Sequence, residues 1–452
     1  MSIKPLAAFK RGLQWRQSNL YISSTEKWRT WNKSPLLIQG LFILLYRVIL
    51  DFVYVCQIIP TYGYMGFELN LIPLNYMLSW MILLVFIPGI LYILRQESCT
   101  SSTIVTFINL LYFIPTTSYI GCKGCSIWFT VAFTVYWLFL LLFQWKVPLL
   151  RLRKLSIIQS HRIFVLLTIL SALLIIGVSG YYTGFRIKTN IADVYNIRAE
   201  AANYDMPTLV SYALSMMTVV LSILIIYWIQ QRKWIRAAIL VFIYILYYSI
   251  NAQKAVFLML VLMLFCCFFY YQWMYRFSPC FITLGVFGAW VLFRIGILQS
   301  IFDLFVRRMM FVLSYISEQY WLFFSEHPIN LFRAGIMRRM GFDAVYSADF
   351  VRVMGEYIGN PNENLNIGAI GDMYANLPVI LGIIFMPLIL VGCFRLLDMV
   401  SHNLSSKITI PMCFLFSLQF TGTSWSTVLL TAGYLVLCVL FYIYPMEKEI
   451  DR

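Results

Sequence analysis

The feature that most constrains this chain is a series of apolar runs, most of them close to 20 residues long. A helix of about 20 residues crosses the roughly 30 Å hydrocarbon core of a bilayer. Apolar residues make up 61% of the chain and charged residues 12%, whereas soluble domains have about 45–50% and 25%. A soluble protein could not bury that much apolar surface. We therefore expect an all-α polytopic integral membrane protein.

Twelve such runs predict about twelve transmembrane helices. We expect one transmembrane domain over residues 35–452, preceded by a basic cytoplasmic tail over residues 1–34. The seventh and eighth runs abut, as do the last two, which predicts hairpins with tight turns. The predicted spans are 35–59, 71–94, 103–120, 127–143, 162–181, 207–229, 236–252, 254–272, 279–300, 377–397, 407–425 and 426–444.

The distribution of Lys and Arg predicts the orientation, because cytoplasmic loops of membrane proteins are enriched in both. With the N-terminus inside, the cytoplasmic segments hold 21 of the 34 basic residues and the short outer loops hold five. Both ends of the chain are then cytoplasmic. The net charge of +15 is explained by this topology and by anionic lipid headgroups, so we expect the bilayer and not a nucleic acid as the partner.

One long segment, residues 301–376, separates the ninth and tenth spans and is predicted to lie outside. Long loops in an otherwise compact bundle are usually functional. Its first part, RRMMFVLSYISEQYWLFF, is aromatic and apolar with charge at its start. This pattern predicts a helix in the outer interface with its apolar side toward the membrane.

Cations from three outer loops form the first candidate site. A guanidinium binds phosphate oxygens through two parallel hydrogen bonds, so such a group suits a phosphate or pyrophosphate headgroup. The alternative is solvated charge paired with Asp193, Glu200 and Asp205. The candidate residues are Arg186, Lys188, Arg198, Lys254, Arg307 and Arg308.

A second candidate is the run from Gly355 to Pro378, which is rich in Gly and Asn. Irregular backbone at membrane depth is tolerated only where protein covers it or where it lines a watery cavity. The groups in Asn366, Asp372, Tyr374 and Asn376 suit the binding of sugar hydroxyls. The alternative for Asp372 is a carboxylate that caps the start of the tenth span.

Charges within the spans are few. Arg47 and Asp51 lie four residues apart on one helix face, which favours a structural ion pair, and Arg294 is near a span end. Beyond these three we expect almost no charge inside the spans. The pair Cys122 and Cys125 lies in CKGC, but no second pair completes a zinc site.

His327, in FFSEHPIN, is the only histidine predicted outside. It is a candidate general base, although a histidine beside proline is more often a turn residue. The chain has no Walker A loop, and its outer loops lack DxD and HExxH motifs, so ATP-driven transport and a metal site are not supported.

The order of short motifs over residues 180–400 resembles the O-antigen polymerase (Wzy-type) family. NIGAIGDMYAN, from Asn366 to Asn376, is similar to that family's glycine-punctuated stretch before a late span. Three further stretches are also similar: VYNIRAE, the polar turn with Lys254, and RRMMF with the Tyr- and Phe-rich stretch and the His-Pro that follow it. Pro378 departs from the family, in which a small residue is common there, so the tenth span is expected to begin differently.

The resemblance implies a glycosyltransferase of the bacterial inner membrane that needs no metal or other cofactor. It would transfer a growing glycan from undecaprenyl pyrophosphate onto a lipid-linked oligosaccharide repeat unit, with inversion, on the periplasmic face. A chain-length regulator is a further candidate partner. Fixed cations would stabilise the departing pyrophosphate, and Asp372, Glu318 or His327 would act as the base.

Two other functions remain open. An O-antigen ligase performs the same chemistry on a different acceptor and usually has a catalytic histidine in one large outer loop. His327, in the long segment 301–376, would be that histidine. A flippase or other transporter of lipid-linked oligosaccharides would place charge along its spans, which this chain largely lacks.

The topology is tested with single cysteines at Ala334 and Ser347 in a background without the native cysteines. We expect both to react with an impermeant thiol reagent in intact inner membranes, because residues 301–376 are predicted to lie outside. Reaction only after the membrane is broken open would show that the orientation is reversed.

Overall fold

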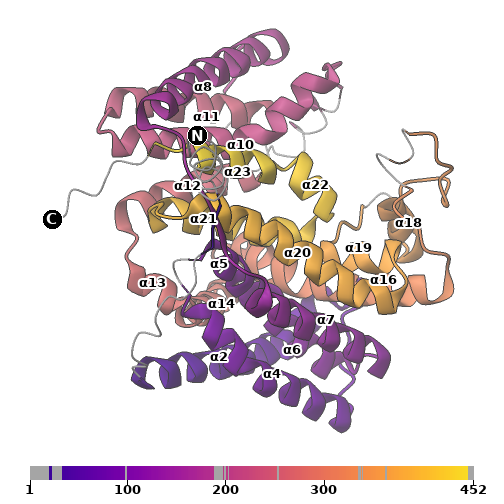
Figure 1. The fold of residues 1–452 in the computed structure, drawn as a ribbon. Helices are drawn as coiled ribbons and strands as arrows, with labels where there is room; N and C mark the ends of the chain where they lie inside the picture. Colours follow the sequence, from indigo (N-terminus) through magenta and orange to yellow (C-terminus); the bar gives the residue numbers. More distant parts are fainter. Residues whose placement is uncertain are drawn as a thin grey trace, which may run out of the picture.

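The structure is a computed structural model of the chain, shown in Figure 1. Nearly all of its regular structure is helical, and two short strands pair with each other. The described residues are 20–22, 33–96, 99–187, 197, 200–201, 203–251, 254–333, 337, 340–361 and 364–445. The expected all-α class is confirmed.

The elements of the first half of the chain follow the predicted spans closely. They are β1 (Leu20–Ile22), α2 (Lys33–Val53), η1 (Tyr54–Ile58), α3 (Ile59–Tyr62), η2 (Gly63–Met65), α4 (Pro73–Leu94), α5 (Thr100–Ile108), η3 (Asn109–Phe113), α6 (Ile114–Lys123), α7 (Ile127–Lys146), β2 (Leu150–Leu152), α8 (Ile157–Val178), η4 (Ser179–Thr183) and α10 (Thr208–Gln230).

The second half adds the long segment between spans and the last helices. Its elements are α11 (Trp234–Asn251), α12 (Lys254–Phe269), α13 (Gln272–Arg276), α14 (Ser278–Arg294), α15 (Gln299–Ile301), η6 (Phe302–Val312), α16 (Leu313–Glu326), α18 (Phe350–Tyr357), α19 (Ala369–Asn376), α20 (Val379–Ser401), α21 (Ser406–Gly422), α22 (Trp425–Leu430) and α23 (Tyr434–Ile443).

Every predicted span coincides with a helix or with helices that continue one another. Among the described residues, eight helices are long and apolar enough to cross a membrane, and three apolar helices are shorter, within α11, α12 and α14. The chain is therefore a multi-pass membrane protein. Twelve crossings remain the prediction of the sequence, since four of the twelve helical segments do not reach that length and composition.

Contacts between loops agree with the predicted alternation of the spans. β1, in the basic tail, pairs antiparallel with β2, in the loop after the fourth span. The Asn70 amide donates to the Cys122 carbonyl over 3.0 Å, which joins two predicted outer loops. The Lys407 ammonium donates to the Cys267 carbonyl over 3.1 Å, which joins two predicted inner ends. Each contact connects two segments that the predicted alternation of the spans places on the same side of the membrane.

One continuous helix, formed by α5, η3 and α6, lies at the centre of the bundle. In its apolar core, 94% of the residues are buried, compared with 28–56% in the other long spans. Many of its residues are Ser, Thr or Gly, and small side chains let neighbouring helices approach closely. Helices α2, α4, α16, α20 and α21 all pack against it. A π-helical turn over Asn109–Phe113 precedes Pro115, whose missing N–H interrupts the regular hydrogen-bond pattern.

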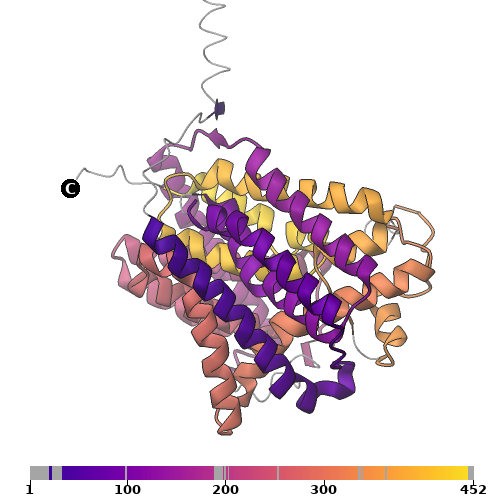
Figure 2. The ribbon, with the colours of Figure 1, turned by 90° about the horizontal axis from the view of Figure 1, so that it is seen from below.

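The long segment 301–376 packs on one end of the bundle. Helices α16, α18 and α19 lie together at the right of Figure 1 and again at the right of Figure 2, which views the molecule from below. We call this the α16 end. The predicted helix over the aromatic stretch is present as η6 and α16, but its buried side contacts protein as well. The Ser314 hydroxyl in α16 shares a 2.8 Å hydrogen bond with the Thr116 hydroxyl of the central helix.

The Arg47–Asp51 pair is structural, as its spacing predicts. Arg47 is fully buried, and its guanidinium donates to Asp51 (2.8 Å), Ser79 (3.0 Å) and Thr117 (3.1 Å). The pair joins α2 to α4 and to the central helix. A buried ion pair with its hydrogen bonds complete is tolerated, whereas the loss of one partner costs about 3–5 kcal/mol.

Gly121 makes room for this ion pair, and we expect Gly121→Ala to lower stability. A Cβ there would lie 2.4 Å from the Ser79 hydroxyl and 3.0 Å from an Arg47 nitrogen. Overpacking of this kind costs about 1–3 kcal/mol. Gly177→Ala in α8 is the control, because its Cβ would have no heavy atom within 4 Å. Equal melting temperatures of the two variants in detergent would contradict the expected role of Gly121.

Candidate functional site

At the α16 end, a buried carboxylate and a cation bridge the central helix and the long segment. Glu318 in α16 accepts the Tyr119 hydroxyl at 2.6 Å and the Lys123 ammonium at 2.7 Å. Lys123 lies over the rings of Tyr119 and Tyr315, 5.5 and 5.3 Å from their centres. The opposite charge and the two aromatic faces hold the Lys123 ammonium in place. We call these four residues the Lys123 cluster.

The predicted Cys122–Cys125 pair borders this cluster as two free, buried thiols. Burial raises the pKa of the Cys125 thiol well above its ordinary value, and the Glu318 carboxylate raises it further. A protonated thiol is a poor metal ligand and a poor nucleophile. Within the described residues, no group of three or more His, Cys, Asp or Glu side chains is arranged to hold a metal ion.

Arg307 in η6 forms a second charged group at the same end. Its Nε lies 3.4 Å from a carboxylate oxygen of Asp303, and its guanidinium lies 4.8 Å from the centre of the Tyr62 ring. The Tyr62 hydroxyl donates to Asp303 in turn. The Nε–H itself is buried and has no hydrogen-bond acceptor, because the ion pair is poorly aligned. Such a donor has a free-energy cost of about 1–3 kcal/mol until an acceptor reaches it.

Asp372 in α19 has a structural contact that the sequence did not indicate. Its side chain is buried and accepts the backbone N–H of Trp425, at the start of α22, over 2.7 Å. It therefore caps α22, whereas the capping alternative expected it to cap the tenth span. Burial raises its pKa to about 7, while the bonds from the Trp425 amide and Ser424 lower it.

The two predicted sugar-binding residues beside Asp372 are also enclosed. The Asn376 carboxamide oxygen accepts the Phe332 amide N–H at 2.9 Å and an Asn330 N–H at 3.1 Å. It thereby fixes the loop after α16. The Tyr374 ring packs edge-on against Trp321, and its hydroxyl is buried with no hydrogen-bond partner among the described residues. Neither side chain is exposed to a substrate in this conformation, whereas Asn366 is exposed.

His327 ends α16 and is exposed. Its ring stacks on Phe323 with centroids 4.1 Å apart, and Nδ1 lies 2.9 Å from the Phe323 carbonyl oxygen. Donation from Nδ1 would leave Nε2 as the acceptor, which is the form that a general base needs. The turn interpretation and the catalytic interpretation of His327 are thus compatible.

The other predicted cations do not join Arg307 in one described cluster. Arg186 pairs with Glu200 at 3.1 Å, as the alternative for that loop expected, and it is largely exposed. Arg308 is exposed next to Arg307. Lys254 begins α12, but its side chain lies outside the described part of the chain, as do all of Lys188 and all of Arg198.

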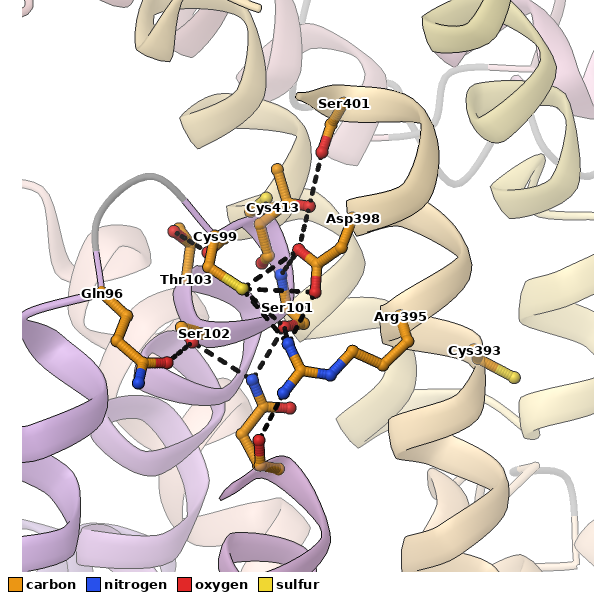
Figure 3. Close-up of polar contacts among 12 residues, drawn as sticks. Gln96, Cys99, Ser101, Ser102, Thr103, Cys393, Arg395, Asp398, Ser401 and Cys413 are labelled. Atoms are coloured by element: carbon orange, nitrogen blue, oxygen red, sulfur yellow. Dashed lines mark hydrogen bonds and ion pairs between the residues drawn. The ribbon is translucent and has the colours of Figure 1, made fainter. Parts of the chain in front are cut away.

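A charged pair that the sequence analysis missed lies at the opposite end of the bundle. Figure 3 shows Arg395 and Asp398 of α20 directed at the start of α5, where the Arg395 guanidinium lies 2.9 Å from Asp398. Asp398 also accepts the Ser101 N–H and the Thr100 hydroxyl, each at 2.9 Å. The expectation of almost no further charge in the spans is therefore wrong. The signal was the spacing of three residues, which places Arg and Asp on one helix face.

The Arg395–Asp398 pair acts as a structural clamp. The carboxylate caps the N-terminus of α5, where a negative charge is favourable, and the guanidinium also contacts the carbonyl of Gln144 at the end of α7. Three helices are joined by these contacts. The Arg395 Nε and the Gln144 carboxamide oxygen are buried without a hydrogen-bond partner among the described residues, as is the Arg307 Nε at the α16 end.

Comparison with protein-family models, with curated proteins and with solved structures found no match to this chain.

Asp372→Asn provides a test of the buried carboxyl group. The folded pKa of about 7 exceeds the ordinary value of 3.8, so the folded protein holds a proton that the unfolded chain releases. Stability contributed by this group is present at low pH and is lost as the pH rises through 7. The amide needs no proton and can still accept the Trp425 N–H.

We therefore expect the melting temperature of Asp372→Asn in detergent, relative to the unsubstituted protein, to rise by about 2–5 °C between pH 5 and pH 8. Asp372→Ala is the companion variant, because it loses the cap as well and should be less stable at both pH values. A constant difference between Asp372→Asn and the unsubstituted protein would show that Asp372 is not protonated on folding.

Proposed function

We propose that this protein polymerises lipid-linked oligosaccharide repeat units into a surface polysaccharide such as O-antigen. The donor would be a glycan on undecaprenyl pyrophosphate and the acceptor a single repeat unit on the same lipid. The observation that carries the proposal is the pairing of Lys123 with Glu318 at the end that also holds Arg307, whose buried Nε–H lacks an acceptor. A pyrophosphate oxygen is an acceptor of the required charge. The resemblance over residues 180–400 supplies the reaction.

The helix geometry favours Glu318 over His327 as the base for a donor held by Arg307. Glu318 follows Arg307 by eleven residues, which is about 17 Å along a helix. His327 is nine residues farther on, at about 30 Å from Arg307. A pyrophosphate and one sugar ring span the shorter distance but not the longer one. Asp372 is occupied by the N-terminus of α22.

Each residue then has a definite role in an inverting transfer. Arg307 and Lys123 bind the pyrophosphate and stabilise the charge that develops on it. As Lys123 moves from the carboxylate to the phosphate, the Glu318 oxygen that held the ammonium becomes free to contact the acceptor hydroxyl. Glu318 takes the proton of the acceptor hydroxyl while that oxygen attacks the anomeric carbon. The carbon–oxygen bond to undecaprenyl pyrophosphate breaks, and its electron pair leaves with the phosphate.

Ligase activity is the second candidate, favoured by one observation. His327 is exposed, and its Nδ1 lies against the Phe323 carbonyl oxygen, which leaves Nε2 for an acceptor substrate. Such a histidine suits an acceptor that approaches from outside the membrane. Transport has less support, because the cavity beside the central helix, lined by Tyr112, Tyr136 and Ala369 among others, holds only about 20 Å³. That volume admits about one water molecule.

We expect Glu318→Gln to abolish polymer while protein levels stay near normal. The amide keeps the shape of the side chain and can still accept the Lys123 ammonium, but it cannot take a proton, so the loss should be about 100-fold or more. Arg307→Lys should also fail, because a point charge does not replace the guanidinium fork. The readout is the glycan ladder made in a deletion strain.

Arg352→Ala is the matched control, since Arg352 is an exposed arginine of the same long segment, on α18. Its ladder should be full length. A normal ladder from Glu318→Gln would remove Glu318 from the mechanism and direct the search to His327.

The deletion strain itself separates the three functions. Loss of a polymerase leaves a single repeat unit on the lipid-A core, and this is the expected result. Bare core with polymer retained on its lipid carrier would indicate a ligase. The absence of any repeat unit outside the inner membrane would indicate a flippase.

A further inference from the structure

An open hollow of about 390 Å³ lies at the start of α8, far in sequence from the α16 end. It is lined by Leu155, Gln159, Arg162 and Ile163. The lining thus combines two apolar side chains with an amide and a guanidinium. Ser156, between the hollow's first two residues, caps α8 by accepting the Gln159 N–H. The hollow lies on the side of the molecule that carries β1 and β2, which the distribution of Lys and Arg assigns to the cytoplasm.

Two further cations, Arg151 and Lys154, come just before this hollow in the chain. Lys154 directly precedes Leu155, and Arg151 belongs to β2, which packs against α20. Lys154 and Arg151 both lower the pKa of His402, the residue that follows α20, in addition to the effect of its burial. Burial lowers the pKa of Lys154 to about 7. The nearest acid on the adjoining helix, Asp398, is engaged by Arg395 and the start of α5.

No ion pair among the described residues includes Arg151 or Arg162. Arg162 is exposed and Arg151 is half-buried, and a guanidinium forms charge-assisted hydrogen bonds with phosphate oxygens. The hollow therefore suits an anionic occupant. The occupant must also contact Leu155 and Ile163, which a free inorganic phosphate would leave without a partner.

The position of the hollow relative to the membrane identifies that occupant. α8 begins a predicted span, and the exposed Ile157 and Ile158 lie beside the hollow. Trp145, at the nearby end of α7, is exposed and stacks under the Lys146 ammonium at 3.9 Å, an arrangement typical of the membrane interface. A lipid at this level would place its headgroup in the hollow and its acyl chains along α8.

We propose that the hollow is a binding site for an anionic phospholipid of the surrounding leaflet. Arg162, in the lining, binds the headgroup phosphate, Arg151, four residues before Leu155, adds to its attraction, and Leu155 and Ile163 contact the upper acyl chain. The site is independent of the proposed transferase activity, because its residues lie at the opposite end of the bundle from Arg307 and Glu318.

The test measures binding of a fluorescent phosphatidylglycerol to the purified protein in a neutral detergent, with phosphatidylcholine as the comparison lipid. Each cation near an anionic headgroup contributes about fivefold in affinity. We expect Arg162→Gln to lose about fivefold and the double variant with Arg151→Gln to lose about 25-fold. Phosphatidylcholine should bind weakly to all of them.

Lys233→Gln is the control, since Lys233 is an exposed cation in the turn between α10 and α11, on the same predicted face. It removes the same charge away from the hollow and should leave binding unchanged. Equal losses from Lys233→Gln and Arg162→Gln would show diffuse surface attraction and would overturn the proposal. Full competition by millimolar inorganic phosphate, or equal binding of phosphatidylcholine, would do the same. An unchanged melting temperature establishes that the variants are folded.

Discussion

Polar groups inside this bundle have no water to bind, so each one depends on another part of the chain. The central helix of α5, η3 and α6 shows the consequence most clearly. It carries hydroxyl and amide side chains at a depth where an unsatisfied group has a cost of several kcal/mol. Its neighbours supply the partners: Arg47 from α2, Ser314 from α16 and Asp398 from α20. These bonds fix which helices surround the centre.

The same constraint acts at both ends of the molecule. At one end, Asp398 caps the start of α5, and Arg395 joins Asp398 to the end of α7. At the α16 end, Glu318 and Lys123 satisfy each other, but Arg307 retains a donor with no acceptor. Both ends thus keep a buried guanidinium nitrogen without an acceptor. The proposed reaction is assigned to the α16 end because Arg307 and Glu318 belong to the long segment that is predicted to lie outside.

Many large apolar side chains lie on the outside of the bundle. Side chains such as Val85, Ile158 and Leu209 are largely exposed on long helices, which would be unfavourable in water and is ordinary against lipid tails. Charge gathers at the helix ends instead. At the start of α8, charge and exposed apolar surface meet. The occupant proposed there is a phospholipid, which has both a charged headgroup and apolar chains.

The sequence alone determined the class, the positions of the helices and the Arg47–Asp51 pair, because these depend on local composition and on spacing along one helix. It also placed charge and carboxylates in the long segment. It did not reveal that Asp372 caps α22, that Asn376 holds the loop after α16, or that Lys123 pairs with Glu318. Those contacts join residues 44–195 positions apart. Only the packing of the helices decides such contacts, because many pairings of polar groups would satisfy the same sequence and one tertiary arrangement selects among them.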